Sequence, residues 1–273
     1  MARVARKVAD KRVLRLVRRF LDAGVMVDGV RQPVAEGTPQ GSPLSPLLSN
    51  IVLDDLDREL QARGLRFVRY ADDVRVYVRS KRAAARVLDG ITNVVEGQLK
   101  LRVNRDKSSV RHAATAVFLG FGFYFRPRGG GVGVRLASGT VIRLKKRLRE
   151  LTRRSWGIAM GYRFHRLTLF VRGWMAYFRI ADNAWLFRDL DEWLRRRVRQ
   201  IYWKQWKRIR TRIRMLHSLG IPKRQAIQWG NSSRAYWRIA GSAVMQRALP
   251  NASLSALGLI SLHDTWQRFR LTA

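Results

Sequence analysis

The stretch RFVRYADDVRVYVR, residues 66–79, indicates two strands joined by a tight turn that carries two adjacent acids. Apolar and β-branched residues alternate with arginines on both sides of the turn, as in a strand-turn-strand unit. Asp72 and Asp73 would therefore lie at the tip of a hairpin. Adjacent carboxylates repel each other, and a divalent cation relieves the repulsion because it neutralises them. By themselves, however, the four residues YADD are more typical of a solvated hairpin turn.

The residues before this hairpin alternate between helical and extended patterns. Apolar residues from about Asp10 to Ala23 follow helical spacing, and Gly24 is suited to end that helix. VMVDGVRQPV, residues 25–34, predicts two short strands around an Asp-Gly turn. GTPQGSPLSP, residues 37–46, predicts a loop, and a helix from Pro46 to Arg63 follows it.

The residues after the hairpin also alternate between helical and extended patterns. We expect a helix from Ser80 to Gln98, a strand from Leu99 to Val103 and an aromatic strand from Val117 to Phe125. The glycine-rich stretch RGGGVGV, residues 128–134, has the composition of a flexible tip. This order favours an α+β fold over a doubly wound sheet.

From Arg143 onward the pattern becomes mostly helical and strongly basic. Residues 143–214 contain 22 Lys and Arg against 5 Asp and Glu, a net charge of +17. The expected helix from Ala184 to Arg208 has apolar residues at helical spacing and arginines on its other face. We therefore predict an amphipathic helix with a basic face.

Composition narrows the class of partner. The 273 residues carry 55 Lys and Arg against 19 Asp and Glu, a formal net charge of +36, which favours polyanions and above all nucleic acid. Apolar runs such as Leu167–Val171 are far shorter than the ~20 residues that cross a bilayer, so we expect no membrane span. The chain has no cysteine, which excludes disulfides and thiolate zinc sites and fits a cytoplasmic location.

Four segments together change the interpretation of the acidic turn. The segments are GTPQGSPLSPLLSNIVLDDLDREL (37–60), FVRYADDVRVYVRS (67–80), LKLRVNRDKSSV (99–110) and VFLGFGFYF (117–125). In order and spacing they resemble successive motifs of the group II intron-encoded reverse transcriptase family. A single motif would be weak, whereas four in sequence are specific.

The resemblance implies a role for each motif. Asp72 would be a direct ligand of two catalytic Mg²⁺ ions, with Mn²⁺ as an alternative, and Asp73 would be its neighbour. Four matching residues would bind the nucleotide and template; they are Pro39, Gln40, Gly41 and Lys107. Three more would form the primer grip; they are Phe118, Leu119 and Gly120. Without the resemblance, the loop at residues 37–46 would be an ordinary turn before a helix, and Lys107 would be one lysine among many. The aromatic strand would simply belong to the hydrophobic core.

The helical half resembles the thumb and maturase region of the same family. RGWMAYFRIADN (172–183), FRDLDEWLRRRVRQIYWKQWKR (187–208) and RALPNASLSALGLISLHD (247–264) carry this part of the resemblance. Gly173 and Trp174 would pack a helix pair. Basic residues of the second segment would line an RNA groove, because guanidinium groups pair with phosphate and stack on bases; they are Arg195, Arg196, Arg199, Lys204 and Lys207.

The resemblance implies an α+β, partial right-hand polymerase. Residues 1–127 would be palm and partial fingers, 128–142 a flexible connection, and 143–273 a helical thumb and maturase-like region. The implied activity is RNA-directed DNA synthesis together with intron RNA binding and assistance to splicing. The implied partners are intron or template RNA, a DNA primer and deoxynucleoside triphosphates.

The sequence departs from the family at its beginning. Family members have a palm strand with a further metal-binding Asp before the helix that begins near Asp10, and residues 1–9 contain no Asp. We therefore expect weak or no polymerisation by this chain alone, and a further polypeptide that supplies the palm strand is an expected partner. Three rivals stay open: a non-catalytic RNA-binding maturase or remnant, a relative in a defence or CRISPR-type system, and a basic membrane-binding protein.

Overall fold

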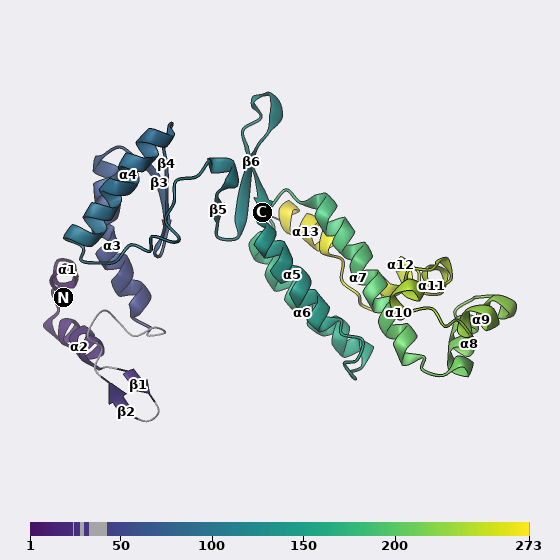
Figure 1. Ribbon diagram of the computed structural model, residues 1–273. Coiled ribbons are helices and arrows are strands. Elements are labelled where there is room, and N and C mark those ends of the chain that lie inside the picture. The colour runs from purple at the N-terminus through teal and green to yellow at the C-terminus, as the bar shows by residue number, and fades with distance from the viewer. Residues whose placement is uncertain (24, 28–29, 33–42, 273) are drawn as a thin grey trace. The chain divides into compact units, whose positions relative to one another are not determined.

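The computed structural model describes residues 1–23, 25–27, 30–32 and 43–272. They form two compact units, Met1–Ala113 and Ala114–Ala273, each with its own hydrophobic core (Figure 1). Both units combine helices with small antiparallel sheets. The expected mixture of helices and strands is therefore confirmed.

The first unit is built around helix α3 and the hairpin that follows it. Its helices are α1 (Ala2–Ala5), α2 (Lys11–Asp22), α3 (Ser45–Ala62) and α4 (Lys81–Asn93), and a π-helical turn, η1 (Val94–Gln98), continues α4. Its strands pair as two antiparallel hairpins, β1 (Val25–Val27) with β2 (Val30–Gln32) and β3 (Arg66–Tyr70) with β4 (Asp73–Tyr77). The helices expected from Asp10 and Pro46 and the strands on both sides of the acidic turn are confirmed.

Helix α3 supplies most of the core of the first unit. Its residues Leu53, Leu56 and Leu60 recur at helical spacing and are buried against Val94 and Val95. Apolar residues of the β3–β4 hairpin pack on the same cluster; they are Phe67, Val74 and Val76. Full burial of a leucine such as Leu60 stabilises the fold by roughly 1.5–3 kcal/mol, and the half-buried hairpin residues contribute less. The hairpin is therefore fixed by one face against α3.

The strand expected from Leu99 to Val103 is wrong. Lys100 has a positive φ of 58°, and the Leu101 N–H donates to the Val95 carbonyl at 2.9 Å. Leu99 is buried in the core at this point. The chain thus turns back on η1. The Leu101 N–H, which a strand would use for pairing, bonds to a carbonyl of η1.

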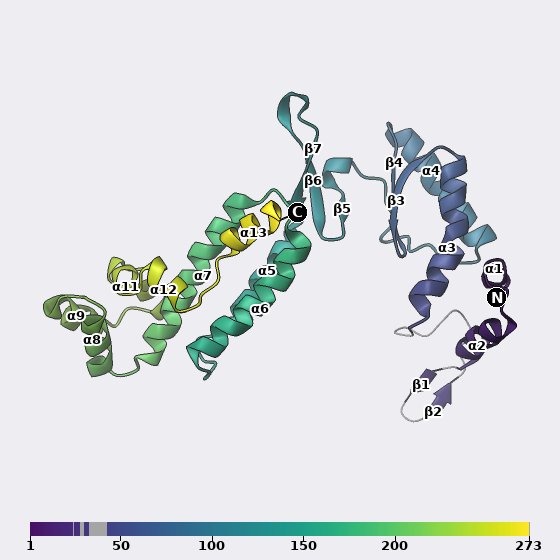
Figure 2. The ribbon, with the colours of Figure 1, turned by 180° about the vertical axis from the view of Figure 1, so that it is seen from behind.

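The second unit joins a three-stranded sheet to a set of helices. Strands β5 (Val117–Phe118), β6 (Phe121–Phe125) and β7 (Val132–Leu136) are antiparallel and lie in that order. The helices, seen from behind in Figure 2, are α5 (Ser138–Leu151), α6 (Met160–Phe178), α7 (Ala184–Gln205), α8 (Ile209–Ser218), α9 (Lys223–Gly230), α10 (Tyr236–Ala240), α11 (Ala243–Ala248), α12 (Asn251–Ala256) and α13 (Leu262–Leu271). No helix in the described part of the chain is both long and apolar enough to cross a membrane.

The longer helices bury regular apolar stripes. Leu144 and Leu148 of α5 share a core with Leu167 and Val171 of α6, and α7 adds Leu190. Helix α13 returns to pack on both α6 and α7. The expected helix from Ala184 is confirmed, and α7 ends at Gln205.

Two details of the second unit differ from the sequence expectations. The aromatic strand is split into β5 and β6, because Leu119 and Gly120 adopt positive φ values of 52° and 84°. The glycine-rich tip leads into β7 at Val132. The division between the two compact units falls after Ala113, and Phe121 and Leu136 are buried in the core of the second unit.

Replacing glycine by alanine should change the stability of the second unit in opposite directions at two positions. At Gly120, with φ +84°, a Cβ would lie 2.9 Å from Thr140 Oγ1 and 3.2 Å from the Phe178 ring. Gly173, expected to pack a helix pair, instead faces open space on α6: apart from its own turn of helix, no atom of the described residues lies within 4 Å of such a Cβ. Gly120→Ala should lower the free energy of unfolding by about 2 kcal/mol. Gly173→Ala should raise it by about 0.5–1 kcal/mol.

Urea denaturation of the two variants beside the wild type measures both changes. Gly173→Ala is the matched control, because it adds the same methyl group within the same unit. Equal stability of the two variants would contradict the strained turn at Gly120.

Candidate functional site: the acidic turn and the basic helical surface

The two adjacent acids lie at the tip of the β3–β4 hairpin. Tyr70 pairs with Asp73 across the ladder, so Ala71 and Asp72 form the connection. Ala71 has a positive φ of 53°, which turns the chain sharply. Asp72 is exposed, and its carboxylate makes no hydrogen bond or ion pair within the described residues. Asp73 Oδ1 forms an ion pair with Arg75 Nη1 at 2.7 Å.

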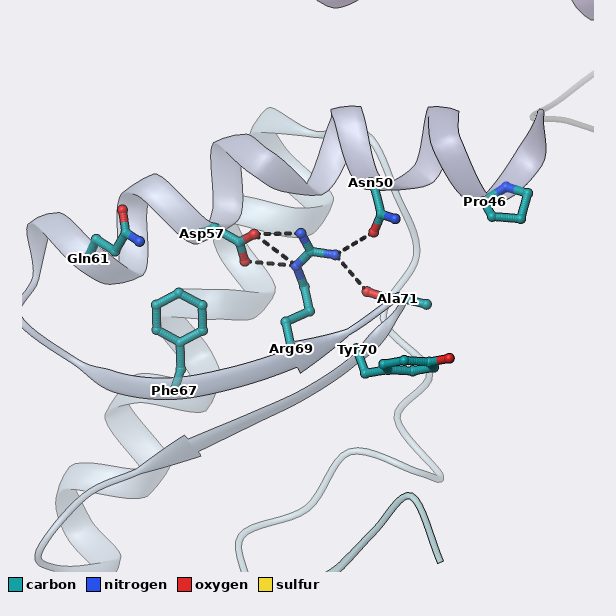
Figure 3. Close-up of a pocket in the computed structure, with 8 residues that line it drawn as sticks. All are labelled: Pro46, Asn50, Asp57, Gln61, Phe67, Arg69, Tyr70 and Ala71. Atoms are coloured by element: carbon teal, nitrogen blue, oxygen red, sulfur yellow. Dashed lines mark hydrogen bonds and ion pairs between the residues drawn. The ribbon is translucent and has the colours of Figure 1, made fainter. Parts of the chain in front are cut away.

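A groove of about 630 Å³ lies beside this turn (Figure 3). Its walls come from α3 and the hairpin; the lining residues are Pro46, Asn50, Asp57, Gln61, Phe67, Arg69, Tyr70 and Ala71. The Arg69 guanidinium lies across it and bonds to Asp57, Asn50 and the Ala71 carbonyl. The hydrogen bonds to Asp57 raise the pKa of Arg69.

The acidic turn offers part of a metal site. Carboxylate oxygens are the hard ligands that Mg²⁺ and similar cations prefer, and Asp72 presents its carboxylate to solvent. Asp73 follows in the same turn, although Arg75 holds one of its oxygens. Among the described residues there is no group of three or more His, Cys, Asp or Glu that could enclose an ion. Within the described residues, the turn therefore presents at most two carboxylates to a cation.

The other residues expected to bind nucleotide or primer are distributed over both units. Pro39, Gln40 and Gly41 lie outside the described residues. Lys107 is in an exposed turn of the first unit, where its N–H donates to Asn104 Oδ1 at 3.1 Å.

The expected primer grip, Phe118 to Gly120, forms the β5–β6 turn of the second unit. The Tyr177 hydroxyl donates to the Leu119 carbonyl at 3.2 Å, and the Thr140 hydroxyl donates to the Gly120 carbonyl at 2.9 Å. The turn is thus anchored to α5 and α6.

The basic residues expected to bind RNA differ in their access to solvent. Lys204 and Lys207 are exposed, and Arg195 and Arg196 are half-buried. Arg199 is buried, and its guanidinium donates to the Leu249 carbonyl at 3.0 Å and to Asn251 Oδ1 at 2.9 Å. Arg199 holds the α11–α12 junction instead of facing RNA. It therefore leaves the set of candidate RNA contacts.

The fold adds an aromatic surface that sequence spacing did not reveal. Tyr236 lies beneath both Arg154 and Lys204, with the cations 4.8 Å and 5.5 Å from its ring centroid. Arg196 stacks 4.3 Å from the centroid of Trp237 and donates to its carbonyl. These five residues, the cation–aromatic cluster, come from three separate segments. In the sequence, only the adjacent basic and aromatic residues of Arg-Ala-Tyr-Trp, 234–237, indicate that cations and rings lie together here.

Comparison with known families accounts for both units. Residues 4–123 match the reverse transcriptase (RNA-dependent DNA polymerase) family, and residues 141–220 match the maturase-specific domain of group II introns. The chain belongs to the group II intron-type reverse transcriptase and maturase family. Reverse transcriptases generally use a divalent metal, which agrees with the chemistry of the acidic turn.

Individual relatives support the family assignment. Protein YkfC of Escherichia coli is 30% identical over a match that covers 44% of this chain and 41% of that protein. The group II intron-encoded protein LtrA of Lactococcus lactis is 38% identical over 23% of this chain and 10% of its own length. The retron Ec86 reverse transcriptase of Escherichia coli is 32% identical over 26% of this chain and 23% of its own length. The chain thus spans less than half of each relative.

Proposed function

We propose that this chain is the catalytic-turn and maturase portion of an RNA-directed DNA polymerase of the group II intron type. One observation carries the proposal. The exposed carboxylate of Asp72 stands at a hairpin tip that is fixed on α3, inside the segment that matches reverse transcriptases. On this proposal residues 1–127 contribute palm and partial fingers, 128–142 connect the two parts, and 143–273 contribute the thumb and maturase-like region.

Asp72 and Asp73 hold Mg²⁺ in this proposal, with Mn²⁺ as an alternative. The bound metal supplies charge neutralisation at the primer 3′-hydroxyl and at the departing pyrophosphate. Lys107 meets the triphosphate of the incoming deoxynucleotide, where its ammonium neutralises charge or donates a proton. Pro39, Gln40 and Gly41 contact the nucleotide and template, and the Phe118–Gly120 turn grips the primer end.

The second unit binds intron RNA and assists splicing in this proposal. Its basic surface and its match to the maturase-specific domain support this role. The proposed contacts are the exposed or half-buried cations that remain after Arg199 is set aside; they are Arg195, Arg196, Lys204 and Lys207. Tyr236 and Trp237 add ring faces beside these charges, and aromatic faces stack on unpaired bases. We place the reaction in the cytoplasm.

A non-catalytic maturase is the second candidate. It is favoured because Arg75 occupies an oxygen of Asp73 and because the described residues contain no third carboxylate or imidazole grouped with this turn. We propose that the carboxylates completing the metal site come from outside the described residues, for example from another polypeptide that pairs with this hairpin. The outward side chains of the hairpin support such a partner, since Val68 is 47% and Tyr70 63% exposed.

The polymerase proposal predicts that Asp72→Asn abolishes primer extension. Asn keeps the shape of the side chain but loses the charge that holds the metal. Extension should fall at least about a hundredfold, because each ~1.4 kcal/mol of lost transition-state stabilisation is tenfold in rate. The assay is extension of a DNA primer on an RNA template, by the chain alone and with a carboxylate-bearing palm segment from a relative.

Asp89→Asn, an exposed change on α4, is the matched control and should retain activity. Extension that survives in Asp72→Asn would remove Asp72 from the metal site. Absence of extension in both arrangements, with RNA binding intact, would favour the non-catalytic maturase.

The maturase proposal predicts salt-dependent RNA binding through the second unit. Each neutralised phosphate should contribute roughly 0.7–0.9 to the slope of log K against log salt. The double variant Lys204→Ala, Lys207→Ala should reduce the slope by about that amount for each phosphate that is no longer neutralised. Filter binding of a structured intron RNA across a salt series measures it.

The double variant Lys11→Ala, Arg12→Ala removes the same charge from the first unit and is the control. An equal reduction in both double variants would mean that net charge acts without a defined surface.

A further inference from the structure

Arg69 connects the acidic turn to the helix that anchors the first unit. Its guanidinium donates from Nε to Asp57 Oδ1 at 2.8 Å and from Nη1 to Asn50 Oδ1 at 2.8 Å (Figure 3). Nη1 also donates to the Ala71 carbonyl at 2.9 Å, and Nη2 donates to the Asp57 carboxylate. Three partners thus share one planar group, which removes most of its rotational freedom.

The two side-chain partners of Arg69 come from one rigid support. Asp57 and Asn50 lie two helical turns apart on α3, the helix whose leucines form the core of the first unit. The ion pair is well shielded, since the side chains of Arg69 and Asp57 are 13% and 21% exposed. A shielded, bidentate arginine–carboxylate pair is geometrically strict. The position of the guanidinium is therefore set by α3.

The third partner of Arg69 controls the turn itself. The Ala71 carbonyl belongs to the peptide plane whose N–H is that of Asp72, so a fixed carbonyl fixes the plane on which Asp72 is mounted. Ala71 also has φ +53°, a conformation that a residue with a side chain rarely adopts unless its surroundings impose it. The hydrogen bond from Arg69 is such a constraint.

We propose that Arg69 is a positioning residue, which transmits the rigidity of α3 to the Ala71–Asp72 peptide and so directs the Asp72 carboxylate. Asp57 and Asn50 hold Arg69 for this task. The role in metal binding rests on the proposed function of Asp72, whereas the role in holding the turn does not.

Three variants separate positioning from simple stabilisation. Arg69→Lys keeps the charge, but one ammonium does not reach Asp57, Asn50 and the Ala71 carbonyl together. Asn50→Ala leaves the ion pair intact and removes one partner from an exposed site, so it preserves the fold if Arg69→Lys does not. Arg63→Lys is the matched control, because Nε and Nη2 of Arg63, the residue that follows α3, both contact one oxygen of Glu59 in a solvated ion pair.

The test combines hydrogen exchange with the metal dependence of primer extension in the full chain. Exchange of the amides in residues 66–77 should accelerate about tenfold in Arg69→Lys and about fivefold in Asn50→Ala, and stay unchanged in Arg63→Lys. In each assay arrangement in which the wild type extends a primer, the Mg²⁺ concentration for half-maximal extension should rise about fivefold or more in Arg69→Lys and Asn50→Ala. RNA affinity should not change.

Unchanged exchange in Arg69→Lys would overturn the proposal. Faster exchange with an unchanged Mg²⁺ requirement would also overturn it, because a merely structural ion pair behaves in that way. A wild type that extends no primer even with the added palm segment would contradict the polymerase proposal alone, and the exchange rates would then decide whether Arg69 holds the turn.

Discussion

Hydrogen bonds from arginine to backbone carbonyls connect the elements of this protein. Carboxylates are scarce, 19 against 55 basic residues, so many guanidinium groups cannot be paired with an acid. Carbonyls near helix C-termini are the alternative, since they lack partners within the helix and carry partial negative charge. Buried Arg163 donates to the Leu151, Arg153 and Trp156 carbonyls, where α5 ends.

Two other arginines repeat this solution. Arg197 of α7 donates to the Arg149 and Thr152 carbonyls, so α7 and α6 both hold the end of α5. Arg199 binds the Leu249 carbonyl at the α11–α12 junction. Burial lowers the pKa of Arg163, Arg197 and Arg199. The second unit thus uses part of its positive charge to hold its helices together and leaves the rest on the surface.

The first unit uses the same chemistry at the site proposed for catalysis. Arg69 has both a carboxylate partner and a backbone carbonyl, and that carbonyl belongs to the turn before Asp72. The excess of positive charge therefore has two consequences in one protein. It creates a surface suited to RNA, and it supplies the rigid cation that we infer directs the exposed Asp72 carboxylate at the tip of the β3–β4 hairpin.

The sequence by itself determined helices α2, α3, α4 and α7, the acidic hairpin and the resemblance to the family. Helical stripes such as Leu53, Leu56 and Leu60 repeat within a few residues, so they can be recognised without knowing the partner surface. The family motifs are also local. These features explain why α3, β3, β4 and α7 were all predicted close to their observed positions.

Only the tertiary structure decided which charges face solvent and where the chain changes direction. Arg196 and Arg199 lie three residues apart on α7, yet Arg196 stacks on Trp237 and Arg199 is buried on Leu249. Lys100 and Leu119 adopt positive φ, which is uncommon for residues with a side chain, so the residue pattern predicted neither the absent strand at Leu99 nor the split aromatic strand. The side-chain partners of Arg69 come from a helix more than ten residues earlier, and periodicity within one element carries no information about contacts between elements.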